Sequence, residues 1–399
     1  MQYALLTAGA LRLLVTRPDT NAYGNATLNM ATSFHLAKHL GARLYTAPVN
    51  PAQHNALTSL ECDGVRRLRT SSLRTRVALA CARCAAIAAR AGLPGLRAVG
   101  TLAELDKDGS GTPEERAYFG VDLRRSYATR PLNIRLSDDA ERDARRRAAS
   151  LGLDEHSRIV TLHVRESAYK ASLGYVDREK DEARNARVET YVEAIDWLVS
   201  RGYTVVRFGD PLMTPIRHPG VVDLATSPVR TPELEIWCVL RSRFLIASDC
   251  GPFNLSVLSS VPCLGVNMTH LIGAYPLRAH DRYILKHVDD VQTGRELTLS
   301  EMLTPGHMKV RWVAGRYTFR DNTPMEIREA VEEMEGALAV PAAAARAQRA
   351  FRDAMAEFLE SDYGRRKSQK GGVQPDFYLG DGWVGDAFAR QSLGLPVSA

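Results

Sequence analysis

The sequence predicts an α/β protein of two domains, each built on a parallel β-sheet with helices on both faces. The chain has 399 residues, which is more than one hydrophobic core usually serves. Short apolar runs typical of strands alternate with segments whose apolar residues recur at helical spacing. The clearest segment is 246–267, IASDCGPFNLSVLSSVPCLGVN, which reads as strand, tight turn, helix and second strand.

The first domain is predicted to span residues 1–150. Its best-defined elements are a strand at 11–16, a turn at 17–25, a helix at 26–41 that ends at Gly41, and a strand at 42–48. The Arg- and Ala-rich segment 57–100 is predicted to be helical, 101–133 to be rich in loops, and 137–152 to be a charged helix. We expect the first residues to belong to the fold rather than to a signal peptide, because no basic segment precedes their apolar part.

The second domain is predicted to span residues 151–323. Its expected elements, in order, are a strand at 158–166, a polar loop at 167–185, a helix at 188–202, strands at 203–210 and 220–225, a helix at 231–242, and the segment 246–267.

The last part of the chain, 324–399, is predicted to contain two helices that end near Glu360 and then a frayed basic stretch at 364–372. The aromatic residues beyond that stretch are too apolar for a disordered tail, so we expect the final segment to pack back on the body of the protein. They are Phe377, Tyr378, Trp383 and Phe388.

Composition limits the kinds of binding partner and the cellular compartment that are expected. The net charge of +6 comes mainly from dispersed arginines, and clustered lysines with interleaved aromatics are absent, so a nucleic-acid partner is not expected. No stretch approaches the roughly 20 apolar residues of a membrane span. The six cysteines lie mostly in apolar surroundings, as buried thiols do in reducing compartments, which predicts a cytoplasmic protein.

Two apparent metal motifs lack essential ligands, so no metal site is predicted. Cys81 and Cys84 form a CxxC inside an Ala-rich run, without a second Cys or His pair at ligand spacing. The segment 106–111, DKDGSG, imitates the first half of a calcium loop, but Ala117 stands where the bidentate Glu is needed.

Polar residues gather where the predicted strands end. Because carboxyl ends of parallel strands form one edge of a sheet, these residues would line a cleft between the domains. An arginine there can bind a diphosphate through its two-pronged guanidinium, and a glycine turn before a helix offers backbone amides to an anion. The residues are His163, Arg165, Glu166, Gly209, Asp210, Ser248, Asp249, Cys250 and Gly251 in the second domain, and Asp19, Gly24 and Asn25 in the first.

Three segments of the second domain resemble a group of bacterial glycosyltransferases, namely 158–166, 184–210 and 243–267. RIVTLHVRE at 158–166 has the HxR strand end of the more distantly related fucosyltransferases, and DCGPFNL at 249–255 is similar to the Asp-x-Gly-Pro-x-x-Leu turn of heptosyltransferases. In the first domain, YGNATLN at 23–29 resembles the GN-containing loop of fucosyltransferase-like folds. Glu166 stands where the fucosyltransferase pattern has a second basic residue.

The resemblance implies two Rossmann-like domains facing a cleft, the GT-B arrangement. The activity would be an inverting Leloir-type transfer of a sugar from a nucleoside diphosphate to an acceptor hydroxyl, with no metal or other cofactor. The nucleotide sugar would bind mainly to the second domain and the acceptor, a small molecule or a glycan, to the first. Arg165 would hold the diphosphate, and Cys250 and Gly251 would add backbone amides.

Further roles follow from the same resemblance. Gly209 and Asp210 would line the nucleotide pocket, and Arg184 with Asn185 would approach the sugar or the acceptor.

The transfer also needs a base for the acceptor hydroxyl. Glu166 and Asp19 are the leading candidates and Asp249 the next, because each is a carboxylate expected at a strand end. His163 fits a packed core position better than a base. Two other functions stay open: an epimerase of nucleotide sugars on the same architecture, and a nucleotide-binding protein without catalysis. An epimerase would act without any acceptor. The sequence does not fix the oligomeric state.

Overall fold

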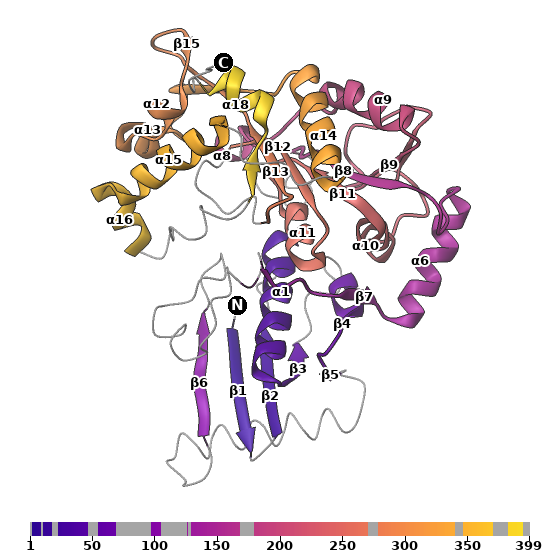
Figure 1. Ribbon diagram of the computed structural model, residues 1–399. Coiled ribbons are helices and arrows are strands. Elements are labelled where there is room, and N and C mark those ends of the chain that lie inside the picture. The colour runs from indigo at the N-terminus through magenta and orange to yellow at the C-terminus, as the bar shows by residue number, and fades with distance from the viewer. Residues whose placement is uncertain are drawn as a thin grey trace. The chain divides into compact units, whose positions relative to one another are not determined.

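The computed structural model describes residues 2–8, 11–17, 23–46, 55–68, 97–104, 126, 129–167, 179–269, 278–339, 346–369 and 382–393 (Figure 1). The chain divides into two compact units, one of residues 1–144 with 257–260 and one of residues 145–256 with 261–399. The division at residue 144 falls within helix α6 (Asp138–Ser150), whose last residue is the predicted domain boundary.

The first unit is organised around a five-stranded sheet of order β5-β3-β2-β1-β6 (Figure 1). Its strands are β1 (Gln2–Ala8), β2 (Leu11–Arg17), β3 (Arg43–Thr46), β5 (Arg67–Leu68) and β6 (Arg97–Glu104). Strands β2, β3 and β5 are parallel, as predicted for the strand, helix, strand segment. The strand β1 was not predicted as a separate element, and it pairs antiparallel with both β2 and β6.

Helix α1 (Tyr23–Leu40) connects β2 to β3. Leu14 of β2 and Phe34 of α1 are fully buried, and the Ser33 hydroxyl donates to Thr16 Oγ1 of β2 over 3.0 Å. The helix ends at Gly41, whose φ of +58° is a conformation that glycine adopts without steric cost. Ala42 N then donates to Ala37 O over 2.9 Å, which closes the end of the helix.

The prediction of a helix over 57–100 is wrong where the structure describes it. The chain there forms the 3₁₀ turn η1 (Asn55–Ser59), strand β4 (Leu60–Cys62), β5 and the start of β6. The Ala-rich run that favoured a helix is 77–92, and the described residues 57–68 contain no Ala; there β4 pairs antiparallel with β7 (Ile134–Leu136). The prediction of loops over 101–133 is also wrong at 101–104, which belong to β6. Cys81, Cys84 and the segment 106–111 lie outside the described residues.

The second unit contains a seven-stranded sheet of order β10-β9-β8-β11-β12-β13-β17, in which all neighbouring strands are parallel. The predicted α/β class is thereby confirmed. The strands are β8 (Ile159–His163), β9 (Thr204–Arg207), β10 (Val221–Asp223), β11 (Ser242–Ala247), β12 (Cys263–Met268), β13 (Arg282–Leu285) and β17 (Trp383–Val384).

The inner strand β8 is buried along its whole length, as expected for a parallel sheet covered on both faces. Helix α9 (Val192–Ser200) follows the 3₁₀ turn η2 (Val188–Tyr191), and α10 (Pro232–Arg241) connects β10 to β11. The Thr231 hydroxyl accepts from Leu234 N over 3.1 Å, and Pro232 occupies the first turn, so this sequence caps α10 at its predicted start.

The C-terminal part of the chain contributes to the second unit. Helix α14 (Pro324–Ala339) lies beside α9, and Glu335 of α14 is also 3.3 Å from Tyr203, which follows α9, between Oε1 and Oη. Helices α15 (Arg346–Glu360) and α16 (Asp362–Gln369) follow, so the prediction of fraying at 364–372 is wrong for 364–369. Strand β17 adds to the sheet beside β13, and Phe388 of α18 (Asp386–Ser392) is buried. Phe377 and Tyr378 lie outside the described residues.

A smaller antiparallel sheet of order β15-β14-β16 completes the second unit. It consists of β14 (His287–Asp290), β15 (Arg295–Glu296) and β16 (Tyr317–Arg320), with the short helices α12 (Leu299–Met302) and α13 (Pro305–Val310) between β15 and β16. Among the described helices, none is long and apolar enough to cross a membrane.

Candidate functional site

The carboxyl ends of the parallel strands in the second unit bring most of the predicted site residues to one edge of the sheet. His163 ends β8, while Gly209 and Ser248 come shortly after β9 and β11. The ends of β8 and β11 are joined directly, because Ser248 N donates to His163 O over 3.1 Å and Ser248 Oγ accepts from Arg165 N over 2.7 Å. Ser248 therefore fixes the backbone at Arg165.

The segment 246–267 folds as predicted. Strand β11 is followed by the 3₁₀ turn η3 (Gly251–Phe253), helix α11 (Asn254–Ser259) and β12. Cys250 precedes this turn in an extended conformation, and its side chain does not cap it. Instead, Cys250 Sγ lies 3.2 Å from His163 Nδ1.

His163 and Cys250 form a buried, uncharged pair. Burial, with the nearby Arg207 and Arg165, lowers the pKa of His163 to about 3. Burial raises the pKa of the Cys250 thiol to about 12. A neutral imidazole in van der Waals range of Phe208, with ring centroids 5.4 Å apart, agrees with the packed core position expected for His163. A neutral thiol is also a poor nucleophile.

Arg165 is held beside the short helix α8 (Glu179–Glu182). Its Nη1 atom donates to the backbone carbonyl of Asp181 and to Asn185 Oδ1, while its Nη2 atom lies 3.6 Å from Asp181 Oδ1. Only 9% of the Arg165 side chain is exposed. The guanidinium is therefore already fixed in position. A ligand that binds to it would cost little further conformational entropy of this side chain.

Arg184 connects the carboxylate of Asp181 to the end of β11. Its Nε atom donates to Asp249 O over 3.0 Å and to Asp249 Oδ1 over 3.2 Å, and its Nη1 atom lies 3.7 Å from Asp181 Oδ1. The second carboxylate oxygen of Asp249 accepts from the Thr269 hydroxyl and, over 3.3 Å, from Thr269 N. Asp249 thus joins the ends of β11 and β12 through fixed hydrogen bonds.

Lys286 is a further cation at this edge that sequence reasoning missed. It follows β13, and its Nζ atom donates over 2.6 Å to both Asn185 O and Asp321 Oδ1. Burial lowers the pKa of Lys286, although Asp321 opposes this. The short apolar run YIL before Lys286 is the signal that could have revealed the strand and its polar end.

A buried pair of asparagines, Asn267 and Asn322, positions the segments that carry Lys286 and Asp321. Asn267 N donates to Asn322 Oδ1 over 2.9 Å and Asn322 N donates to Asn267 Oδ1 over 2.6 Å, and both side chains are fully buried. Asn267 has a φ of +56°, a conformation that is uncommon for residues other than glycine. Its Nδ2 atom also donates to Tyr191 Oη over 3.1 Å. Asn322 Nδ2 also donates to Leu285 O over 2.7 Å and Lys286 N donates to Met268 O over 2.9 Å, so the two segments that carry Lys286 and Asp321 are fixed to the end of β12.

Glu166 is engaged as a counterion of Arg207. Its Oε1 accepts from Arg207 Nη2 over 3.0 Å, and its Oε2 accepts from both Thr214 N and Thr214 Oγ1 over 2.9 Å. Arg207 is fully buried and also binds Asp223, at 3.2 Å. Both oxygens of Glu166 thus have structural partners, which disfavours its use as a mobile base.

Gly209 and Asp210 form a tight turn after β9. Gly209 has a φ of +145°, and its N–H donates to Glu235 Oε1 over 3.2 Å. Asp210 Oδ1 accepts from Leu212 N over 2.9 Å and so closes the turn. Glu235, a residue that sequence reasoning missed, pairs with Arg230 at 2.7 Å, and burial raises its pKa to about 7.

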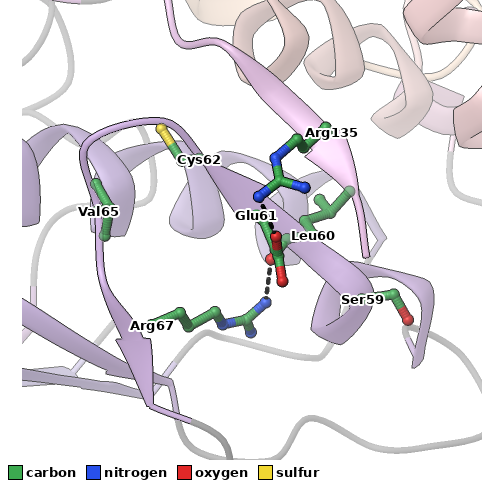
Figure 2. Close-up of a pocket in the computed structure, with 7 residues that line it drawn as sticks. All are labelled: Ser59, Leu60, Glu61, Cys62, Val65, Arg67 and Arg135. Carbon is green, nitrogen blue, oxygen red and sulfur yellow. Dashed lines mark hydrogen bonds and ion pairs between the residues drawn. The ribbon is translucent and has the colours of Figure 1, made fainter. Parts of the chain in front are cut away.

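In the first unit, Gly24 and Asn25 lie in the first turn of α1, and Asp19 lies outside the described residues. This unit also contains a cavity of about 170 Å³ (Figure 2). On its walls Arg67 Nη1 donates to Leu60 O over 2.6 Å, and Arg135 pairs with Glu61 at 2.6 Å. None of the predicted site residues that the structure describes lines this cavity.

Within the described parts of both units, no group of three or more His, Cys, Asp or Glu side chains is placed to hold a metal ion.

No protein-family model and no curated protein sequence matches the chain. Among solved structures, it is similar to Escherichia coli ADP-heptose lipopolysaccharide heptosyltransferase II, with 12% identity, a TM-score of 0.41 and coverage of 82% of this chain and 98% of that one. A family 9 glycosyl transferase from Veillonella parvula matches with 12% identity, a TM-score of 0.36 and coverage of 63% and 79%. E. coli heptosyltransferase WaaC with ADP matches with 12% identity, a TM-score of 0.36 and coverage of 68% and 90%. These TM-scores are too low to support a function.

Proposed function

We propose that the protein is a glycosyltransferase that moves a sugar from a nucleoside-diphosphate sugar to an acceptor hydroxyl. The observation that carries the proposal is the cationic edge of the parallel sheet in the second unit. Arg165, Arg184 and Lys286 come together there beside the glycine turn after β11. Fixed cations and backbone amides at such an edge suit the diphosphate of a nucleotide sugar.

In this proposal Arg165 binds the diphosphate and stabilises the nucleoside diphosphate as it departs. Arg165 follows β8, and its guanidinium is already fixed by Asp181 and Asn185, so no reorganisation is needed in the transition state. The amides of Cys250 and Gly251 add hydrogen bonds to the same group. Gly209 and Asp210 line the nucleotide pocket, and Arg184 with Asn185 faces the sugar.

Asp19 is the base that we propose for the acceptor hydroxyl. Glu166 is bound to Arg207 and Thr214, and Asp249 is bound to Arg184 and Thr269. A proton acceptor needs a lone pair that can reach the substrate, and these contacts occupy the carboxylates of both. The first domain, which carries Asp19, would bind the acceptor. The transfer is proposed to invert the anomeric centre and to proceed without a metal. Arginines would supply the positive charge that a metal ion supplies in other transferases.

The test is a thermal-shift screen of nucleoside diphosphates and sugar nucleotides, followed by assays of transfer with and without an acceptor. A ligand that binds only the native protein raises its melting temperature by mass action. We expect stabilisation by at least one nucleoside diphosphate and sugar transfer that survives excess EDTA. Activity that EDTA abolishes and manganese or magnesium restores would refute the metal-independent mechanism, and epimerisation without an acceptor would refute transfer.

A further inference from the structure

His287 is buried between two carboxylates that come from different elements of the second unit. It is the first residue of β14, and only 8% of its side chain is exposed. Its Nδ1 atom lies 2.6 Å from Glu296 Oε1 of β15, and its Nε2 atom lies 3.0 Å from Glu326 Oε2 of α14. An ionised carboxylate can only accept a hydrogen bond, so both ring nitrogens must carry a proton to donate to the two carboxylates at once. Only the imidazolium form of His287 makes both contacts.

His218 pairs with a carboxylate in a different way. Its Nδ1 atom accepts from Gly220 N over 3.1 Å, and its Nε2 atom lies 2.9 Å from Asp196 Oδ1. One nitrogen accepts and the other donates, and the neutral imidazole satisfies both contacts. A carboxylate beside one ring nitrogen therefore does not require a charged histidine. His287 differs because a carboxylate faces each of its nitrogens.

The Glu326 carboxylate depends on the proton of His287. Glu326 is buried, and within the described part of the chain His287 is its one ion-pair partner. Its other contacts are hydrogen bonds, because Thr323 N and Thr323 Oγ1 donate to Oε2 and Ser392 Oγ of α18 donates to Oε1. Although burial opposes it, hydrogen bonds from His287 and Thr323 lower the pKa of Glu326 to about 2. A neutral His287 would leave a buried negative charge without a cation, which is costly.

The other charges beside His287 belong to the small sheet. Arg320 lies opposite His287 on β16, where it binds Glu296 over 2.8 Å and both carboxylate oxygens of Asp289. Two carboxylates share this arginine, so the imidazolium adds positive charge where negative charge is in excess. From α18 the uncharged Phe388 ring packs on His287, with ring centroids 5.8 Å apart.

We propose that protonated His287, with Glu296 and Glu326, is a pH-sensitive clasp that holds the small sheet to the first turn of α14 and to the end of α18. When the proton leaves, the ring can donate to only one of the two carboxylates. Glu326, which forms a capping box with Thr323, then loses its cation. His287 directly follows Lys286, so the clasp also makes the segment that carries this cation sensitive to pH. The clasp does not depend on the proposed function.

The direction of the pH effect follows from the pKa of His287. Burial lowers this pKa, but hydrogen bonds to Glu326 and Glu296 outweigh burial and raise it above the ordinary value of about 6.5. The clasp is therefore complete below about pH 6.5 and opens as the pH rises through the pKa of His287 in the folded protein. In that range, transient opening of the attached segments should become more frequent by up to about tenfold per pH unit.

Hydrogen exchange of the full chain between about pH 6 and pH 9, followed by mass spectrometry, tests the proposal. Protection factors, corrected for the intrinsic effect of pH on exchange, are compared for peptides that cover 287–297, 323–330 and 386–392. In the unaltered protein we expect protection of all three to fall by up to about tenfold per pH unit above about pH 6.5. In His287→Gln, which cannot take up the proton, this fall should be absent. Glu235 and Glu333, whose pKa values are also raised, are retained in the variant and cannot produce a difference between the two proteins.

His218→Gln is the matched control, because it also removes a histidine that pairs with a carboxylate. It should keep the pH dependence of the unaltered protein. Glu326→Gln keeps the test decisive if His287→Gln does not fold: it removes one of the two carboxylates, so protection should fall less with pH. Protection that is independent of pH in the unaltered protein would overturn the clasp. So would an undiminished pH dependence in His287→Gln or in Glu326→Gln.

Discussion

Replacing Glu166 by Gln separates a structural role of this residue from a catalytic one. Glu166 accepts hydrogen bonds from Arg207, Thr214 N and Thr214 Oγ1. A hydrogen bond to a charged group contributes about 1.5–3 kcal/mol, and Gln can keep part of this set as an acceptor. The Glu166 side chain is 19% exposed, which reduces the loss further, so we expect the free energy of unfolding to fall by about 1–3 kcal/mol.

Asp223→Asn is a close control for this experiment. Asp223 binds the same guanidinium of Arg207, and it also accepts from a backbone N–H, that of Ile216, and from a threonine hydroxyl, that of Thr226. The two carboxylates thus have nearly the same set of partners. If both are structural, both variants should lose similar stability in urea titrations.

Turnover per folded molecule decides the question. If Glu166 is structural, both variants keep turnover within about threefold of the unaltered protein, since loss of a general base costs roughly 10²–10⁴-fold. A loss of that size in Glu166→Gln but not in Asp223→Asn would refute our reasoning and make Glu166 the base. Asp19→Asn should instead show the large loss.

Three further predictions concern stability. Burial alone would lower the pKa of His287, but hydrogen bonds to Glu326 and Glu296 outweigh it and raise the pKa. The stability that protonated His287 contributes is therefore complete below about pH 6.5 and is lost as the pH rises through the pKa of His287 in the folded protein. Urea midpoints should fall more steeply above about pH 6.5 in the unaltered protein than in His287→Gln. Parallel curves for the two proteins would contradict this. Gly209→Ala should cost about 1–3 kcal/mol, because φ is +145° and the new Cβ would lie 2.6 Å from Met213 Sδ, whereas Gly336→Ala on helix α14, with no atom within 4 Å of the new Cβ, should be neutral or stabilising. Truncation after Tyr363 removes β17 and α18 with the buried Phe388, so the melting temperature should fall by about 5 °C or more, and an unchanged value would show that this segment does not stabilise the protein.

The sequence predicted the second unit well because the local pattern and the tertiary structure agree there. Apolar runs of strand length alternate with capped helices, and Arg165 and Asp249 follow strands that a parallel sheet must align at one edge. The segment after residue 57 was predicted wrongly because the helical pattern of its Ala-rich part, 77–92, was extended back to residues 57–68, where β4 gains its stability from β7, more than 70 residues later.

Local sequence patterns could not predict which carboxylates pair with the cations of the site. Asp181 and Asp321 lie far along the chain from the strand ends that they serve, and nothing in their neighbouring residues indicates which cation they face. The same holds for Glu166, which appears in the sequence as a carboxylate at a strand end. Only the structure shows that Arg207 and Thr214 engage both of its oxygens.

The most direct test of the central claim, that the carboxyl edge of the seven-stranded sheet binds a diphosphate, is the nucleotide affinity of Arg165→Ala beside that of Arg158→Ala. Both arginines flank strand β8, but Arg158 precedes it, where Nη1 donates to Arg201 O over 2.8 Å and the guanidinium lies over the Tyr203 ring. Calorimetry with the nucleoside diphosphate that stabilises the protein most should show that Arg165→Ala weakens binding by about 2–4 kcal/mol, roughly 30- to 1000-fold. Arg158→Ala should bind as the unaltered protein does. A folded Arg165→Ala variant with undiminished affinity would contradict the claim.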